Sequence, residues 1–153
     1  MQLWNRQARS FGSARAALEW IPGQEYSEHV FLYFVDVERA RAHRDTRSLR
    51  LLLATFEPVG QPIQMESTHS RLLFRGLKQS LRDTDVVGWY RQDLVAGVVL
   101  TQRADAPEHD VSQGVLRRVV PLLDQHLPLP LSTTLRLRVT EMPPRFKTGA
   151  GGA

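Results

Sequence analysis

The sequence contains no cysteine among its 153 residues. Disulfide bonds and metal sites built on cysteine thiolates are therefore excluded, and this composition is compatible with a reducing compartment. No apolar run reaches the roughly 18–20 residues needed to cross a bilayer. The first residues also lack the apolar core of a secretory signal. We therefore expect a cytoplasmic protein with no membrane span.

Lysine is scarce as well, since Lys78 and Lys147 are the only two and arginine supplies the other basic side chains. Arginine suits bidentate contact with phosphate or carboxylate groups. The formal net charge is only +4, however, and so small a surplus does not indicate nucleic-acid binding. The length and the charged fraction of 24% are those of one ordinary globular domain.

The apolar pattern predicts a mixture of strands and helices. In chain order we expect a strand at 29–37, a helix at 38–56, a helix at 70–82, strands at 86–90 and 93–101 joined by a turn at Arg91-Gln92, a helix at 105–126 and a strand at 132–140. Residues 57–69 hold two prolines and a glycine, which predicts a long loop whose role the sequence leaves open. Pro121 is expected to kink or shorten the helix that contains it.

The element order βααββαβ is that of an α+β, ferredoxin-like antiparallel sheet with helices packed on it. Residues 1–25 are expected to form an N-terminal helix or extension, residues 26–142 the domain, and residues 143–153 a disordered tail. The right-handed crossover rule places the first strand beside the hairpin. Asp36, at the end of that predicted strand, is therefore expected to lie close to the hairpin tip.

A short motif, Arg82-x-x-Asp85, lies where the helix predicted at 70–82 ends, just before the hairpin. An arginine fork can hold a phosphate group or a guanine edge, and a carboxylate can accept hydrogen bonds from guanine N–H groups. The motif is short enough to arise by chance. A local ion pair at a helix end is therefore the alternative interpretation.

These segments resemble the GGDEF domain of diguanylate cyclases, in a degenerate form, over roughly residues 28–141. In that family the first strand ends in a D-x-D-x-F-K-x-x-N-D pattern, which we match to residues 36–45. A helix ending in R-x-x-D, then five residues and the GGDEF hairpin follow in the family. The corresponding signature positions here are Arg91, Gln92, Asp93, Leu94 and Val95. The resemblance implies a nucleotide cyclase-like fold that is truncated at the C-terminus relative to the family.

The departures from the family pattern bear on catalysis. Arg91 and Gln92 replace both signature glycines, Leu94 replaces a metal-binding acidic residue, and Arg44 stands where the family has an asparagine that reads guanine. Two-metal phosphoryl transfer needs acidic ligands for both cations. The resemblance therefore implies a protein that is not an enzyme and requires no cofactor, with Asp36 and Asp93 as vestiges of a metal site.

In relatives the R-x-x-D motif is the inhibitory site that binds the product, cyclic di-GMP. The resemblance thus implies a bacterial signalling module that binds cyclic di-GMP through Arg82 and Asp85 and acts on a protein partner. Two alternatives stay open. One is a nucleotide-independent protein–protein interaction module of the same fold, and the other is a divergent nucleotidyl cyclase that uses Asp36 and Asp93. The identity of the partner and the formation of a homodimer also stay open.

Overall fold

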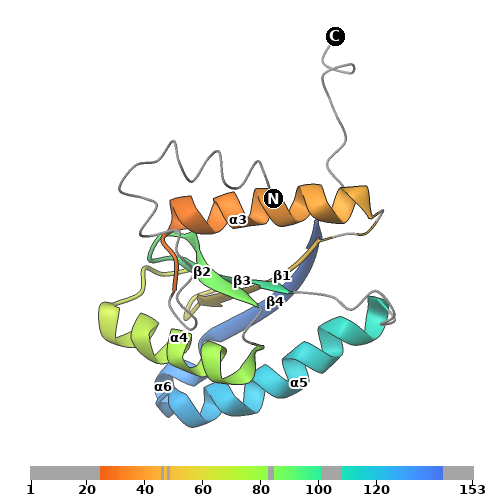
Figure 1. Cartoon of the computed structure of the whole chain (residues 1–153). Coiled ribbons are helices and arrows are strands. Elements are labelled where there is room, and N and C mark those ends of the chain that lie inside the picture. The colour runs from red at the N-terminus through yellow and green to blue at the C-terminus, as the bar shows by residue number, and fades with distance from the viewer. Residues whose placement is uncertain (1–24, 46, 48, 83–84, 101–107, 143–153) are drawn as a thin grey trace.

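A computed structural model of the chain describes residues 25–45, 47, 49–82, 85–100 and 108–142. Labelled as in Figure 1, its elements are α3 (Glu28–Arg44), β1 (Leu49–Phe56), α4 (Ser67–Ser80), β2 (Val86–Arg91), β3 (Val95–Leu100), α5 (Glu108–His126), α6 (Leu129–Ser132) and β4 (Leu135–Met142). The predicted N-terminal extension, apart from residue 25, and the predicted tail at 143–153 lie outside the described residues.

The four strands form one antiparallel sheet in the order β2-β3-β1-β4. Helix α3 covers one face of the sheet, and α4 and α5 lie on the other (Figure 1). The predicted α+β class is confirmed. The first strand of the sheet does lie beside the hairpin strand β3, but it is β1 and not the segment predicted at 29–37. In the part of the chain that is described, no helix is both long and apolar enough to span a membrane.

The strand predicted at 29–37 is wrong, because these residues belong to helix α3. The buried residues of the helix are Val30, Phe31, Phe34 and Val35. Leu32 and Asp36, between and after them, are exposed. Buried positions that recur every three or four residues are those of a helix with one face against a sheet. The high β-propensity of the apolar and aromatic residues concealed this spacing, since propensity yields to tertiary packing.

The first strand, β1, instead begins at Leu49, within the stretch predicted as a helix at 38–56. Seven of its eight residues are buried. This is expected for a central strand that is covered on both faces. The later predictions agree better with the structure, since α4, the hairpin strands, α5 and β4 all lie where helices and strands were expected. Helix α5 continues through Pro121 to His126 and is not shortened by it.

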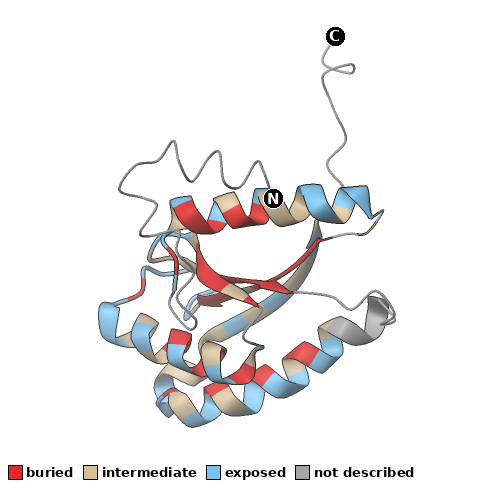
Figure 2. Cartoon of the chain, in the orientation of Figure 1, coloured by how far each residue is buried: buried red, intermediate tan, exposed pale blue. Residues whose placement is uncertain are grey.

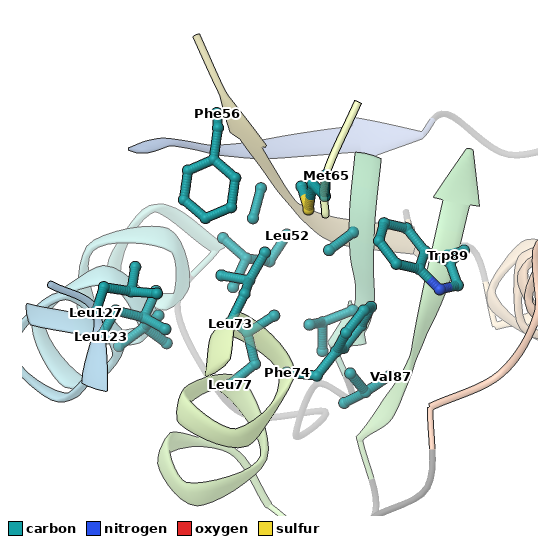
Figure 3. Packing of buried hydrophobic residues seen from close by; sticks show 14 of the residues in the cluster. Leu52, Phe56, Met65, Leu73, Phe74, Leu77, Val87, Trp89, Leu123 and Leu127 are labelled. Carbon is teal, nitrogen blue, oxygen red and sulfur yellow. The ribbon is translucent and has the colours of Figure 1, made fainter. Parts of the chain in front are cut away.

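The sheet separates two clusters of buried side chains. The larger cluster lies between the sheet and α4/α5, where Phe74 packs edge-on against Trp89 with ring centroids 4.9 Å apart (Figure 3). The smaller cluster joins α3 to the other face through Phe31, Val35 and Leu51. Figure 2 shows the same division, with buried residues in the N-terminal half of α3 where it faces the sheet and exposed residues on its outer side.

The outer edge of β2 is covered by a backbone strap at Tyr26. The Tyr26 N–H donates to the carbonyl oxygen of Val87 (3.1 Å), and the Trp89 N–H donates to the carbonyl oxygen of Tyr26 (2.8 Å). A Cβ atom at Gly88 would lie 2.7 Å from that Tyr26 oxygen and 3.0 Å from the Phe31 ring. The absence of a side chain at Gly88 therefore allows the strap and α3 to approach β2 closely.

Candidate functional site

The Arg82-x-x-Asp85 motif forms a tight turn between α4 and β2. The Asp85 N–H donates to the Arg82 carbonyl oxygen (3.0 Å). The Arg82 N–H donates in return to Oδ2 of the Asp85 carboxylate (3.0 Å). Asp85 is 8% exposed, whereas Arg82 is exposed. The contact between the two residues thus runs through the Arg82 backbone, and Asp85 shapes the turn that carries the Arg82 side chain.

The end of helix α4 leads directly into this turn. The Ser80 hydroxyl donates to the carbonyl oxygens of Gly76 and Leu77 and satisfies acceptors in the last turn of the helix. Lys78, in the same helical turn, is half-buried. Burial lowers the pKa of its ammonium group, and nearby Glu25 opposes the shift. Lys78 therefore carries a cost of desolvation in the helical turn that leads into the motif.

The hairpin tip differs from the predicted two-residue turn at Arg91-Gln92. Strand β2 continues to Arg91, β3 begins at Val95, and residues 92–94 form the turn. The Leu94 N–H donates to the Arg91 carbonyl oxygen (3.0 Å). Asp93 adopts a left-handed conformation with φ of 61°, which aspartate and asparagine adopt more readily than most residues with a side chain. Asp93 is therefore part of the turn and not the first residue of the returning strand.

Two separate segments hold this tip in place. The Gln92 N–H donates to Oε1 of Glu28 (2.6 Å), and the Glu28 N–H donates to Oε1 of Gln92 (3.1 Å). On the other side, the Met65 N–H of the 57–66 loop donates to the Asp93 carbonyl oxygen (2.7 Å). The signature positions Gln92 and Asp93 thus serve as attachment points for the start of α3 and for the long loop.

The structure does not bring Asp36 to the hairpin tip, so that expectation is wrong. The tip contacts Glu28, in the first turn of α3, whereas Asp36 is an exposed residue eight positions further along the same helix. Eight residues of helix correspond to about 12 Å along its axis. Among the described residues, no group of three or more histidine or acidic side chains comes together as metal ligands would.

The corrected position of the first strand also changes the comparison with the family motif. The strand that lies beside β3 ends at Thr55-Phe56 and is followed by Glu57. The D-x-D pattern was matched to residues 36–38, which lie on α3 instead. The end of the true first strand therefore carries one carboxylate, at Glu57, where the family pattern has two.

The motif turn and the hairpin tip are distinct sites. They lie at opposite ends of β2, a six-residue strand, and are therefore separated by about 20 Å. The sequence located both correctly relative to β2. It did not indicate the contact between Gln92 and Glu28, because the two residues are 64 positions apart and neither belongs to a recognisable pairing motif.

The fold is similar to solved structures of diguanylate cyclases. One is the diguanylate cyclase SiaD from Pseudomonas aeruginosa, solved in complex with its activator SiaC, with 17% identity and a TM-score of 0.59. The match covers 99% of this chain and 62% of that one, so this chain spans less than two thirds of that protein. A DGC protein from Thermotoga maritima has 12% identity and a TM-score of 0.51, with 79% and 83% of the two chains covered.

Comparison of the sequence alone adds no relative. No protein-family model matches it, and no curated protein matches it either. The assignment of the fold therefore rests on the structural similarity. The chain has the α+β fold of a diguanylate cyclase (GGDEF) domain.

Proposed function

We propose that this protein is a non-catalytic GGDEF-like module that binds cyclic di-GMP at the Arg82-x-x-Asp85 turn and transmits the signal to a protein partner. The observation that carries this proposal is the contrast between the two ends of β2. At one end Asp85 fixes a turn that presents an exposed Arg82. At the other end the signature positions are engaged in contacts within the chain.

The non-catalytic part of the proposal rests on the hairpin tip and on the end of β1. Leu94 replaces an acidic signature residue, and β1 ends without paired carboxylates. Phosphoryl transfer with two cations requires carboxylates that hold both ions. The bonds from the Gln92 N–H to Glu28 and from the Met65 N–H to Asp93 also favour a tip that serves to join parts of the fold.

The ligand part of the proposal rests on complementary chemistry. Cyclic di-GMP offers phosphate oxygens and guanine edges, and both accept the paired N–H groups of a guanidinium. Arg82 is exposed and can supply that fork. Asp85 is buried and bonded to the Arg82 backbone, so we assign it the role of positioning the turn. Arg82 is then the residue that touches the ligand.

Calorimetry with cyclic di-GMP tests this assignment. We expect heat of binding with the unaltered protein and with Arg71→Ala, an exposed arginine at the other end of α4, and none with Arg82→Ala. Absence of heat with the unaltered protein would contradict the proposal that it is a cyclic di-GMP receptor.

In a separate assay with nucleoside triphosphates and Mg²⁺ or Mn²⁺ we expect no cyclic product. Product that is lost in Asp93→Asn would show that the protein is an enzyme.

A nucleotide-independent interaction module is the second candidate. It is favoured by the solved SiaD structure, in which a diguanylate cyclase is bound to a protein activator. The two candidates differ in one measurement. If the module works without a nucleotide, Arg82→Ala leaves its association with a protein partner unchanged, and added cyclic di-GMP has no effect on that association.

A further inference from the structure

The two edge strands of the sheet, β2 and β4, differ in whether another segment of the described chain bonds to their outer side. The β2 edge is covered by the Tyr26 strap, which bonds to Val87 and Trp89. Strand β4 forms the other edge and pairs with β1 along its whole length, from Leu135 to Met142. In the described part of the chain no strand pairs with the outer side of β4. Figure 2 shows its residues as intermediate or exposed, beside the buried central strands.

The register identifies which backbone groups point outward from β4. The Glu57 N–H donates to the Thr134 carbonyl oxygen (2.8 Å), which makes this a hydrogen-bonded pair one step beyond Phe56 and Leu135. Hydrogen-bonded and non-hydrogen-bonded pairs alternate in an antiparallel ladder. Arg136, Arg138 and Thr140 therefore bond toward β1. The residues that present their N–H and carbonyl groups to the open edge are Leu135, Leu137, Val139 and Glu141.

The side chains of β4 divide by face in the same alternating way. Leu135, Leu137 and Val139 pack against the cluster under α4 and α5. Arg136 and Arg138 point to the α3 side and are exposed. No described carboxylate forms an ion pair with either guanidinium. One nitrogen of Arg136 donates to the carbonyl oxygens of Thr133 (3.2 Å) and Leu135 (3.0 Å), so one outward carbonyl near the start of β4 is already engaged.

We propose that the β4 edge binds an extended segment of another protein as a fifth strand. The segment would have acidic side chains at alternate positions, opposite Arg136 and Arg138, and apolar side chains between them, opposite Leu137 and Val139. Main-chain bonds to an open edge supply affinity in strand addition, and alternate side chains supply selectivity. Exposed charges on an edge also discourage indiscriminate pairing. Two arginines on one face exclude basic strands and favour acidic ones.

Charge also argues against a second copy of this chain as the added strand. In a two-fold antiparallel pair, residues that lie opposite one another share a face of the joined sheet. The α3-side residues of β4 are Arg136, Arg138, Thr140 and Met142, whereas Glu141 points to the other face. No such register places an acidic residue of one β4 opposite Arg136 or Arg138 of the other. The β4 edge and the Arg82 turn, which leads into β2, belong to opposite edges of the sheet, and strand addition at β4 does not depend on cyclic di-GMP binding.

Peptide binding to the full chain tests the proposal. The probe is a capped peptide as long as β4 with alternating glutamate and valine, and the comparison peptide has lysine in place of glutamate. At low ionic strength we expect the glutamate peptide to bind and the lysine peptide not to bind. The amide signals of Leu137, Val139 and Glu141 should shift on binding, and their hydrogen exchange should slow. Absence of protection at these amides with the glutamate peptide would overturn the proposal.

Two further arms separate strand addition from simple charge attraction. A glutamate peptide with N-methylated amides on its bonding edge keeps its charge but loses its donors, so it should not bind. Equal binding of the methylated peptide would overturn strand addition. Arg136→Glu/Arg138→Glu should weaken the glutamate peptide by about tenfold or more. Arg117→Glu/Arg118→Glu makes the same charge change on exposed residues of α5 and should have little effect. Equal losses in the two variants would also overturn the proposal.

Discussion

Gln92 and Glu28 bind each other through two hydrogen bonds, although 64 positions separate them in the chain. Each residue donates its backbone N–H to the side-chain oxygen of the other. Glu28 is the first residue of α3, and Ser27 before it makes no side-chain capping bond. Gln92 therefore satisfies a free N–H group at the start of α3 from the hairpin tip. This arrangement couples the position of α3 to the geometry of the tip.

Removing this contact should destabilise the domain. We expect Gln92→Ala to lower the free energy of unfolding by about 1 kcal/mol, since the Glu28 N–H loses its acceptor. The backbone N–H at position 92 keeps its bond to Glu28 Oε1. Urea unfolding measures the change. Glu28→Ala removes the other bond, which the Gln92 N–H donates, and should lower the free energy of unfolding by a similar amount, because each substitution deletes one of the two side-chain acceptors. Gln125→Ala, at an exposed position on α5, serves as the control, and losses in Gln92→Ala and Glu28→Ala no larger than that of the control would contradict the pairing.

The two residues of the motif turn should respond differently to mutation. Asp85→Ala removes a buried carboxylate that accepts the Arg82 N–H and should cost about 1–3 kcal/mol of folding free energy. Arg82→Ala changes an exposed side chain and should alter stability by less than about 0.5 kcal/mol. Denaturant unfolding of both variants decides the matter. A larger stability loss in Arg82→Ala would show that the guanidinium supports the fold.

Two glycines should respond oppositely to alanine. At Gly88 a Cβ atom would lie 2.7 Å from the Tyr26 backbone oxygen, so Gly88→Ala should cost about 1–3 kcal/mol through displacement of the strap or of α3. At Gly114, inside α5, a Cβ atom meets nothing within 4 Å. Gly114→Ala should therefore stabilise the protein by up to about 1 kcal/mol. Thermal unfolding compares the pair, and a Gly88→Ala variant as stable as the parent would exclude the close approach.

Lys78 should make stability depend on alkaline pH. Burial lowers the pKa of its ammonium group below the ordinary 10.5, so the folded state holds this proton less tightly than the unfolded chain. The buried ammonium group therefore lowers the free energy of unfolding at neutral pH, and this loss is relieved as pH rises through the lowered pKa toward 10.5. Lys78→Met should therefore be more stable at neutral pH, and its advantage should shrink as pH rises through this window.

Tyr33 affects the free energy of unfolding in the same alkaline pH range as Lys78, but in the opposite direction. Burial raises the pKa of its hydroxyl above the ordinary 10.0, so the unfolded chain loses this proton more readily than the folded state. The free energy of unfolding therefore falls as pH rises above 10.0. Subtraction of the urea-unfolding curves of Lys78→Met and the parent protein cancels Tyr33, which both proteins contain. A difference that stays constant from neutral to alkaline pH would rule out the assignment to Lys78.

The sequence was most informative where short-range pattern and tertiary packing agree. Leu73, Phe74 and Leu77 recur at helical spacing and are buried on α4. Strand β4 alternates between half-buried and exposed residues over most of its length, as its sequence predicts. The misassigned residues 29–37 lacked such agreement. They are rich in residues that favour strands, yet their burial follows the period of a helix.

The sequence by itself determined the α+β class, the hairpin and the spacing of Arg82 and Asp85 from it, because these depend on contacts between near neighbours in the chain. Only the tertiary structure decided that α3 is a helix, because the choice depends on the sheet that covers one of its faces. It also decided that Asp36 lies away from the hairpin tip and that Gln92 binds Glu28. Both follow from the packing of segments far apart in sequence, which local propensity does not encode.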